Sequence, residues 1–183
     1  LAAAMVELSY WNKDRILLDP FCGSGTIPIE AALIARNIAP GLNRHFASEK
    51  WERVPESLWK EERRKCYEAI DYDCMPEIYG SDIDPAAIEL AKANAELAGV
   101  DDCITFEVKP VQDTELYGDY GCLITNPPYG ERLGDVKEVE NMYRALGGIM
   151  HENSTWSTYV ITSMEYFEKL FGKKASAKRK LFN

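Results

Sequence analysis

The chain has 183 residues, a length that suits a single domain. Hydrophobic residues make up 46% of it and charged residues 28%, a globular composition that argues against a disordered, collagen-like or coiled-coil chain. With 21 Lys and Arg against 30 Asp and Glu, the formal net charge is -9, and on charge alone this disfavours a nucleic-acid partner, because phosphate binding relies largely on Lys and Arg.

The cysteines and the apolar segments indicate the cellular environment. Five cysteines without a C-x-x-C pair, and only two histidines, predict reduced thiols, no metal site and a cytoplasmic protein. No apolar run approaches the roughly 18 residues of a membrane span, and no leader resembles a signal peptide. Residues 1–11 begin with Leu1 inside a predicted helix, so we expect a further segment before them.

The first predicted unit is a strand, a glycine loop and a helix. Residues 15–19 (RILLD) form an apolar run without helical period, and the turn-rich PFCGSGT follows at once. Apolar residues from Ile29 to Leu33 then recur at helical spacing, and Pro40 with Gly41 predicts the stop. Residues 43–72, dense in charged and aromatic side chains, are expected to be an insertion or long crossover that carries a surface helix.

The rest of the chain repeats the alternation of strand and helix. Further strands are predicted over residues 78–81, 104–108, 121–125 and 158–162. Helices are predicted over 85–98, with Asp84 as its N-cap, along the apolar stripe within 139–149, and over 166–171. This order predicts an α/β fold with a mostly parallel, doubly wound sheet covered on both faces, whose ligands bind beyond the carboxyl ends of the strands.

The glycine loop suits a nucleotide-like ligand. Gly23 and Gly25 allow close backbone approach and positive φ, and the following helix offers free N–H groups. No Lys-Ser/Thr pair follows as in a Walker loop, and Pro28 replaces the third glycine of a dinucleotide fingerprint. The carboxylate of Asp19, at the strand end, instead suits a cationic group such as an amino-acid ammonium.

The second strand end supplies the remaining parts of a cofactor site. Asp82 can accept hydrogen bonds from both ribose hydroxyls, and Ile83 offers an apolar face to an adenine. A ribose, an adenine and an ammonium together describe S-adenosylmethionine. Glycine loops and Asp-Pro turns also serve as plain connections, but their occurrence at successive strand ends favours a site.

The segment NPPY, Asn126, Pro127, Pro128 and Tyr129, follows the fourth strand and predicts the chemistry. The side-chain oxygen of Asn126 and the carbonyl of Pro127 can accept both hydrogens of an exocyclic base amine, which localises the nitrogen lone pair for attack on a methyl group. The two prolines fix the loop, and Tyr129 can stack on an extruded base. No strong general base is needed, because the methylated amine becomes acidic.

Several other residues are weaker candidates. Cys22 is expected to be a small packing residue and not a nucleophile. Trp51, Trp59 and Tyr67 are expected in the core or rim of the insertion, in preference to a base-stacking platform. The basic tail, residues 173–183, is expected to be a solvated end. Arg132 could reach a phosphate or carboxylate, or form a structural ion pair.

The motifs DPFCGSGT, GSDIDP and NPPYGERL, in this order, resemble class I S-adenosylmethionine-dependent methyltransferases over essentially the whole chain. Within them, the chain is similar to the ribosomal RNA large-subunit guanine-N2 methyltransferases and their relatives labelled adenine-specific DNA methylases. The resemblance implies a Rossmann-like sheet of seven strands ending in a hairpin, and the last strand is expected to be absent here. It also implies an RNA-binding THUMP-type region before this domain as the main RNA grip. The oligomeric state stays open.

The resemblance assigns residues to the cofactor and to the target base. Asn126 to Tyr129 would hold the target amine and base, with Asn126 also beside the cofactor. The family commonly has an acidic residue for the adenine amine where this chain has Pro110, so Asp113 is expected to compensate or the cofactor to bind more weakly. The expected cofactor-binding residues are Asp19, Pro20, Phe21, Cys22, Gly23, Ser24, Gly25, Thr26, Asp82, Ile83, Asp113 and Asn126.

Three functions follow in order of preference. The first is methylation of guanine N2 in large-subunit ribosomal RNA, and the second keeps the mechanism with adenine in DNA as substrate. The third is a non-catalytic module that binds the cofactor or RNA during assembly, which the proline at position 110 motivates.

Overall fold

The computed structural model describes residues 1–129 and 136–181. Within them lies one five-stranded sheet, in which every strand pairing is parallel and the strand order is β3-β2-β1-β4-β5. The α/β, doubly wound sheet is therefore confirmed. The strands are β1 (Leu17–Asp19), β2 (Ile78–Asp82), β3 (Ile104–Val108), β4 (Cys122–Thr125) and β5 (Ser157–Val160).

The helices also follow the sequence pattern, with ends displaced by a few residues. The α-helices are α1 (Ala2–Leu8), α2 (Thr26–Ala35), α3 (Glu56–Glu68), α4 (Pro85–Ala98), α5 (Val136–His151) and α6 (Phe167–Phe171). The described residues also form three short 3-10 helices: η1 (Ala47–Lys50), η2 (Asp101–Cys103) and η3 (Val111–Asp113). As the DP sequence predicts, the Asp84 side chain caps α4 by accepting a hydrogen bond from the Ala86 N–H at 2.9 Å.

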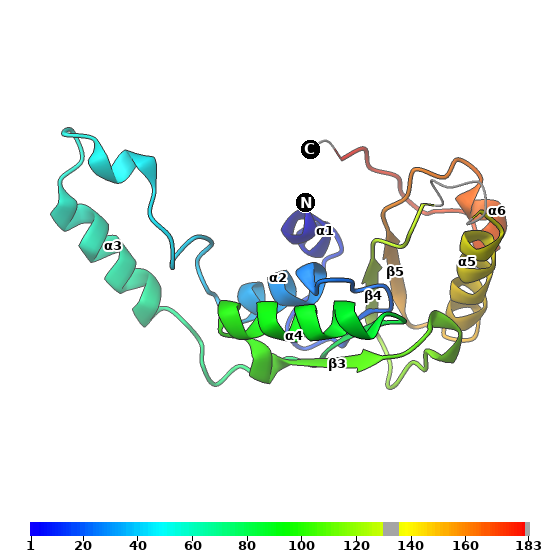
Figure 1. The fold of residues 1–183 in the computed structure, drawn as a ribbon. Helices are drawn as coiled ribbons and strands as arrows, with labels where there is room; N and C mark the ends of the chain where they lie inside the picture. Colours follow the sequence, from blue (N-terminus) through cyan, green and yellow to red (C-terminus); the bar gives the residue numbers. More distant parts are fainter. Residues whose placement is uncertain (130–135, 182–183) are drawn as a thin grey trace.

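Two hydrophobic clusters lie on opposite faces of the sheet, because successive strand residues point to opposite sides. Leu17 and Ile78 belong to the cluster that packs against α1, α2 and α4, while Leu18 and Leu123 pack toward α5 and α6. Figure 1 shows α4 and α2 stacked over one face and α5 with α6 at the β5 side.

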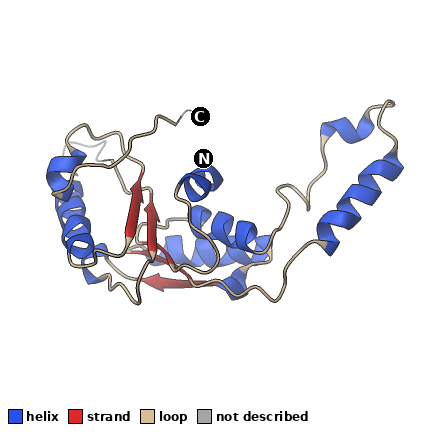
Figure 2. Cartoon of the chain, turned by 180° about the vertical axis from the view of Figure 1, so that it is seen from behind, coloured by secondary structure: helices blue, strands red, loops and turns tan. Residues whose placement is uncertain are grey.

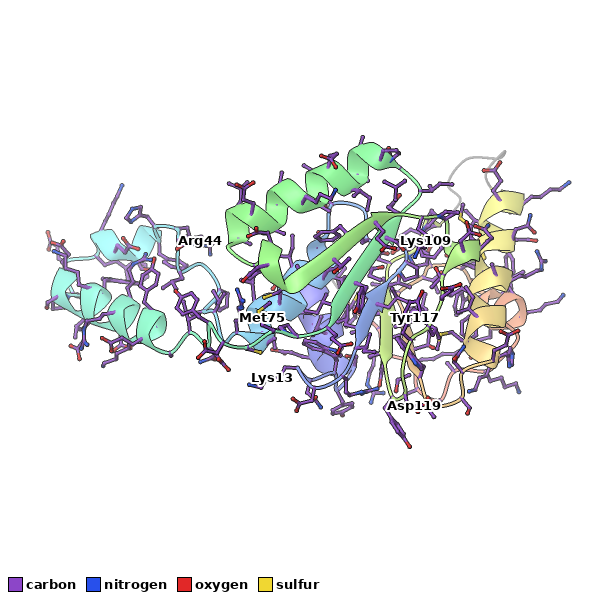
Figure 3. The ribbon with its side chains drawn as sticks, turned by 90° about the horizontal axis from the view of Figure 1, so that it is seen from below. Lys13, Arg44, Met75, Lys109, Tyr117 and Asp119 are labelled. Atoms are coloured by element: carbon purple, nitrogen blue, oxygen red, sulfur yellow. The ribbon has the colours of Figure 1, made fainter. Side chains whose placement is uncertain are left out.

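Helices cover both faces of the sheet except on the side of β3 that points away from α4, in agreement with the absence of a predicted helix between residues 108 and 121. Thr105 and Glu107 point away from α4 and are exposed, since η3 and an irregular segment connect β3 to β4 in place of a full helix. Figure 3 looks onto this side, where Lys109 and Tyr117 lie in that segment. The resemblance implied seven strands; the described residues contain five, and residues 172–181 after α6 form no strand.

The insertion, residues 43–72, forms an arm that stands apart from the sheet (Figure 2). It consists of η1, an outer turn and α3, which confirms the predicted surface helix; no residue of α3 is buried. Elsewhere, too, the described helices are all too short or too polar to cross a membrane.

The contact between α5 and α6 depends on one glycine. A Cβ atom added to Gly147 would lie 2.2 Å from the backbone oxygen of Phe171, so only glycine permits this approach of the two helices. The adjacent Gly148 is exposed, and a Cβ atom there would meet nothing within 4 Å. The two positions therefore form a matched pair within one helix.

We expect Gly147→Ala to lower the free energy of unfolding by about 1 to 3 kcal/mol, because α6 must move away from α5. Gly148→Ala should raise it by roughly 0.5 to 1 kcal/mol, since alanine is the better helix former. Urea unfolding monitored by circular dichroism measures both. Equal effects of the two substitutions would contradict the close contact.

Candidate active site

The site lies at β1, where the strand order changes direction: β2 and β3 follow on one side of β1, and β4 and β5 on the other. Strand β1 lies between β2 and β4, so the segments after β1 and β4 diverge and leave the crevice in which open α/β sheets bind ligands. Across this point the Thr125 hydroxyl donates a hydrogen bond of 2.6 Å to Oδ1 of Asp19. The bond links the end of β1 to the residue that directly precedes Asn126.

The Asp19 carboxyl group is nearly inaccessible, with 1% of its surface exposed. Burial raises its pKa to about 7, against the opposing effect of hydrogen bonds from Thr125 and from the Phe21 N–H, while the nearby Asp82 raises it further. Both hydrogen bonds end on Oδ1. A cationic group beside Asp19 would compensate the buried negative charge, as the sequence predicts.

The glycine loop places its backbone near open space. Gly23 has φ +52°, and a Cβ atom there would meet nothing within 4 Å, so the loop backbone lies open at this residue. Gly25 caps α2 in the left-handed conformation at φ +82°, and a Cβ atom there would lie 3.0 Å from Ala91 and from the ring of Phe106. Gly23 therefore leaves room for a ligand beside the loop backbone, whereas Gly25 allows close packing against α4.

Hydrogen bonds fix the loop to its neighbours. The Cys22 N–H donates to the Ser81 carbonyl at 2.9 Å, and the Gly23 N–H donates to Oδ2 of Asp82 at 3.0 Å. From α4, the Asn94 amide donates to the Ser24 carbonyl at 3.0 Å. The loop is thus pre-organised by β2 and α4 together.

Asp82 therefore has a structural task in addition to its predicted contact with a ribose. Its Oδ2 holds Gly23, and its Oδ1 accepts the Asp84 N–H at 3.0 Å. A carboxylate offers about four acceptor sites, so capacity for ribose hydroxyls remains. The next residue, Ile83, is 65% exposed, which leaves its apolar side chain available for an adenine.

The remaining predicted cofactor residues differ in accessibility. Pro20 and Cys22 are buried, Phe21 packs against the core cluster beneath α5, and Thr26 is exposed. Burial, with Asp19 and Asp82 nearby, raises the pKa of the Cys22 thiol, which agrees with a packing role.

Asp113 lies at the end of η3 and is exposed. Its N–H donates to the Pro110 carbonyl at 3.0 Å, so both residues belong to one turn after β3. The compensating contact of Asp113 with an adenine stays a prediction.

The NPPY segment continues from β4 into the crevice. Asn126 and Pro128 are exposed, whereas Pro127 is buried. The Tyr129 hydroxyl donates a hydrogen bond to Oδ1 of Asn126, so the acceptor oxygen and the aromatic ring lie together. Residues 130–135, including Arg132 and the end of the NPPYGERL motif, lie outside the described part of the chain.

Tyr143, part of the predicted apolar stripe of α5, supports this segment. Tyr143 of α5 is fully buried, and its hydroxyl donates to the Pro128 carbonyl at 2.9 Å and lies 3.3 Å from Oγ1 of Thr162. A tyrosine on a buried helix face is itself a signal, because its hydroxyl requires a partner. Its ring also packs edge-on against Phe167, 5.0 Å between centroids.

Comparison with known families identifies the fold and its relatives. The family described as "RMKL-like, methyltransferase domain" matches residues 1–183. The chain belongs to this family. The methyltransferase resemblance noted in the sequence is therefore confirmed, and with it the Rossmann-like fold of the class I methyltransferase type.

Curated relatives place this methyltransferase domain within longer proteins. The protein named "Putative RNA methyltransferase YpsC" of Bacillus subtilis (strain 168) is 51% identical over 183 residues, which cover 100% of this chain and 48% of YpsC. Ribosomal RNA large subunit methyltransferase K/L of Shewanella baltica (strain OS195) is 43% identical over 189 residues, covering 100% of this chain and 27% of that protein. The methyltransferase domain thus spans half or less of these relatives.

Solved structures agree with this assignment. A predicted N6-adenine-specific DNA methylase from Listeria monocytogenes str. 4b F2365 is 50% identical with a TM-score of 0.95, over 99% of this domain and 48% of that chain. SMU.472, solved in complex with SAH, is 44% identical with a TM-score of 0.94, over 100% of this domain and 48% of that chain.

The raised pKa of Asp19 predicts how stability depends on pH in the ligand-free domain. The folded state holds the proton up to about pH 7 while the unfolded state releases it near the ordinary value of 3.8, so stability falls as pH rises between them. We expect Asp19→Asn to remove this loss, which amounts to about 2 to 4 kcal/mol between roughly pH 4 and pH 7.5. Chemical unfolding at several pH values measures it; parallel curves for variant and parent would contradict the buried carboxyl.

Proposed function

We propose that the chain methylates an exocyclic base amine with S-adenosylmethionine as donor, and that its target is guanine N2 in large-subunit ribosomal RNA. The observation that carries this is the Asp19–Thr125 hydrogen bond, which places the glycine loop and the NPPY segment side by side. The name of the Shewanella relative supports RNA as substrate, and SAH in SMU.472 supports the cofactor.

The residues present fit this cofactor. Open space at Gly23 admits a ligand against the loop backbone, the buried Asp19 carboxyl suits the ammonium, and exposed Ile83 suits the adenine. Asp82, with free acceptor sites, would hold the ribose, and Asp113 is the proposed contact of the adenine amine. When bound, the cofactor supplies an electrophilic methyl group on its sulfonium.

The chain's own task is to hold the amine correctly. Oδ1 of Asn126 and the Pro127 carbonyl accept the two amine hydrogens, and the nitrogen lone pair is thereby aimed at the methyl group. In the structure the Tyr129 hydroxyl donates to Oδ1 of Asn126, and the second lone pair of this amide oxygen is left for the incoming amine. The Tyr129 ring, beside Asn126, can stack on the target base.

Positioning, and not a strong base, supplies most of the rate in this proposal. A well-oriented pair of reactants can gain about 7 kcal/mol or more. The buried Pro127 and the Tyr143–Pro128 hydrogen bond hold the segment in shape before substrate arrives. Little reorganisation is then left for the reactive complex.

Binding of the whole RNA requires more than this domain. The net charge of -9 is unfavourable for phosphates, and the relatives are about twice as long or longer. We therefore assign most of the RNA binding to a THUMP-type region of the full-length protein. We also propose that the full-length protein is cytoplasmic.

Adenine in DNA is the second candidate substrate, because the similar Listeria protein is described as a predicted N6-adenine-specific DNA methylase. A non-catalytic assembly module is the third. The three predict different products: N2-methylguanine in RNA, N6-methyladenine in DNA, or no methylated base.

We expect Asn126→Ala in the full-length protein to reduce methyl transfer at least 100-fold, because one amine acceptor is lost. Cofactor affinity measured by calorimetry should change little. Asn141→Ala, an exposed asparagine on α5, serves as the matched control with parental activity.

The assay uses labelled S-adenosylmethionine with unmodified ribosomal RNA or DNA, followed by identification of the methylated nucleoside. A parent protein that transfers no methyl group to either substrate would contradict the enzymatic proposal. N6-methyladenine in DNA as the sole product would replace guanine in RNA as the target.

We expect Tyr143→Phe to lower kcat roughly 10-fold, the value of one lost hydrogen bond to the Pro128 carbonyl. The KM for cofactor and the thermal midpoint should stay near those of the parent, because the aromatic ring and its packing remain. Tyr159→Phe, a half-buried tyrosine on β5, is the control. A kcat equal to that of the control would remove Tyr143 as a positioning residue.

A further inference from the structure

The arm, residues 43–72, is a folded unit of its own. The rings of Phe46 and Trp59 stack with centroids 5.9 Å apart. Arg63 of α3 donates to the carbonyls of Leu42 and Arg44 and forms an ion pair of 2.6 Å with Glu49. These contacts hold η1 against α3, so the arm presents its outer turn in a defined shape (Figures 1 and 2).

The outer turn exposes an indole. Trp51, directly after η1, is 64% exposed, whereas Trp11 and Trp156 are buried and Trp59 is partly buried under Phe46. Trp59 therefore lies inside the arm, whereas Trp51 lies exposed at its rim. A large aromatic side chain held outward on a rigid element is typical of a contact surface.

The charges around Trp51 favour a polyanion. The arm carries seven basic and seven acidic residues, so it has none of the net negative charge of the whole chain. Within the arm most charges pair with each other, as Lys60 does with Glu56 and Arg64 with Glu68. Lys50, Glu52 and Arg53, which surround Trp51, have no ion pair among the described residues, so residues 50–54 carry a net charge of +1.

The arm lies at the end of the domain opposite to the proposed active site. In a parallel sheet, α2 runs back from the carboxyl ends of the strands, and the insertion leaves after α2 and returns to the start of β2. At a rise of about 1.5 Å per residue, α2 covers about 15 Å and α3 about 20 Å. A ligand that reaches both places must be a long molecule.

We propose that the outer turn, residues 50–54, is a second RNA contact, in which Trp51 stacks on an unpaired base and Lys50 and Arg53 bind adjacent phosphates. An aromatic face between two unpaired cations matches the way proteins bind single-stranded segments. The inference rests on the proposed function for its choice of RNA, and it specifies that the substrate is a large RNA with an unpaired segment remote from the methylated base.

Trp51 fluorescence and RNA affinity test this directly. In vitro-transcribed large-subunit ribosomal RNA should quench the tryptophan emission of the full-length protein, and Trp51→Ala should abolish the quenching. Its Kd for the RNA should rise at least about 5-fold, the effect of one lost stacking contact. Tyr10→Ala, an exposed aromatic on the body, should leave Kd unchanged.

The cations are tested by salt dependence. Replacing Lys50 and Arg53 together by Gln should reduce the slope of log K against log salt by about 1.4, roughly 0.7 for each lost contact with single-stranded phosphate. Lys60→Gln, which alters a paired lysine of the same arm, should leave the slope unchanged. Circular dichroism verifies that α3 persists in each variant.

The outcomes separate this inference from the proposed function. Unchanged RNA affinity in Trp51→Ala overturns the RNA contact even when methyl transfer by the parent is normal. Loss of self-association in that variant, seen by sedimentation, also overturns it in favour of a second copy of the chain as partner. Methyl transfer to the same RNA is recorded separately, and its absence in the parent would contradict the proposed function alone.

Discussion

The hydrogen bond between Thr125 and the buried Asp19 is the constraint on which the site depends. It joins the last residue of β4 to the last residue of β1, so the glycine loop and the NPPY segment start from one fixed point. Its carboxyl partner is shielded from water, which makes the bond strong and an unpaired charge there costly. In the proposed reaction, cofactor and target amine are therefore brought together without movement of the sheet.

Around this bond, the glycine loop and the NPPY segment are fixed by hydrogen bonds from neighbouring strands and helices. Asp82 and Asn94 fix the glycine loop from β2 and α4, and Tyr143 fixes the NPPY segment from α5. Helix α5 is in turn seated against α6 through Gly147. Residues far apart in the sequence thus act as one rigid support, as expected where catalysis relies on position.

Much of this could be predicted from the sequence, because strands, helices and turn motifs are local signals. RILLD predicted β1, DPFCGSGT predicted the loop after it and NPPY predicted the turn after β4, and the parallel topology followed from the alternation of strands and helices. The partner of Asp19 could not be predicted, since nothing local connects Thr125 with it. The side of β3 without a helix agrees with the sequence, in which no helix is predicted between residues 108 and 121. Whether Trp51 lies in the core or at the rim of the arm could not be predicted either, because the exposure of an indole depends on the tertiary fold.

The arm is attached at the amino ends of the strands, whereas the loops of the proposed active site all lie at the carboxyl ends. Sequence change in residues 43–72 can therefore accumulate without disturbing Asp19, Asp82 or Asn126. The topology thereby separates the segment proposed to contact RNA from the residues proposed to methylate it.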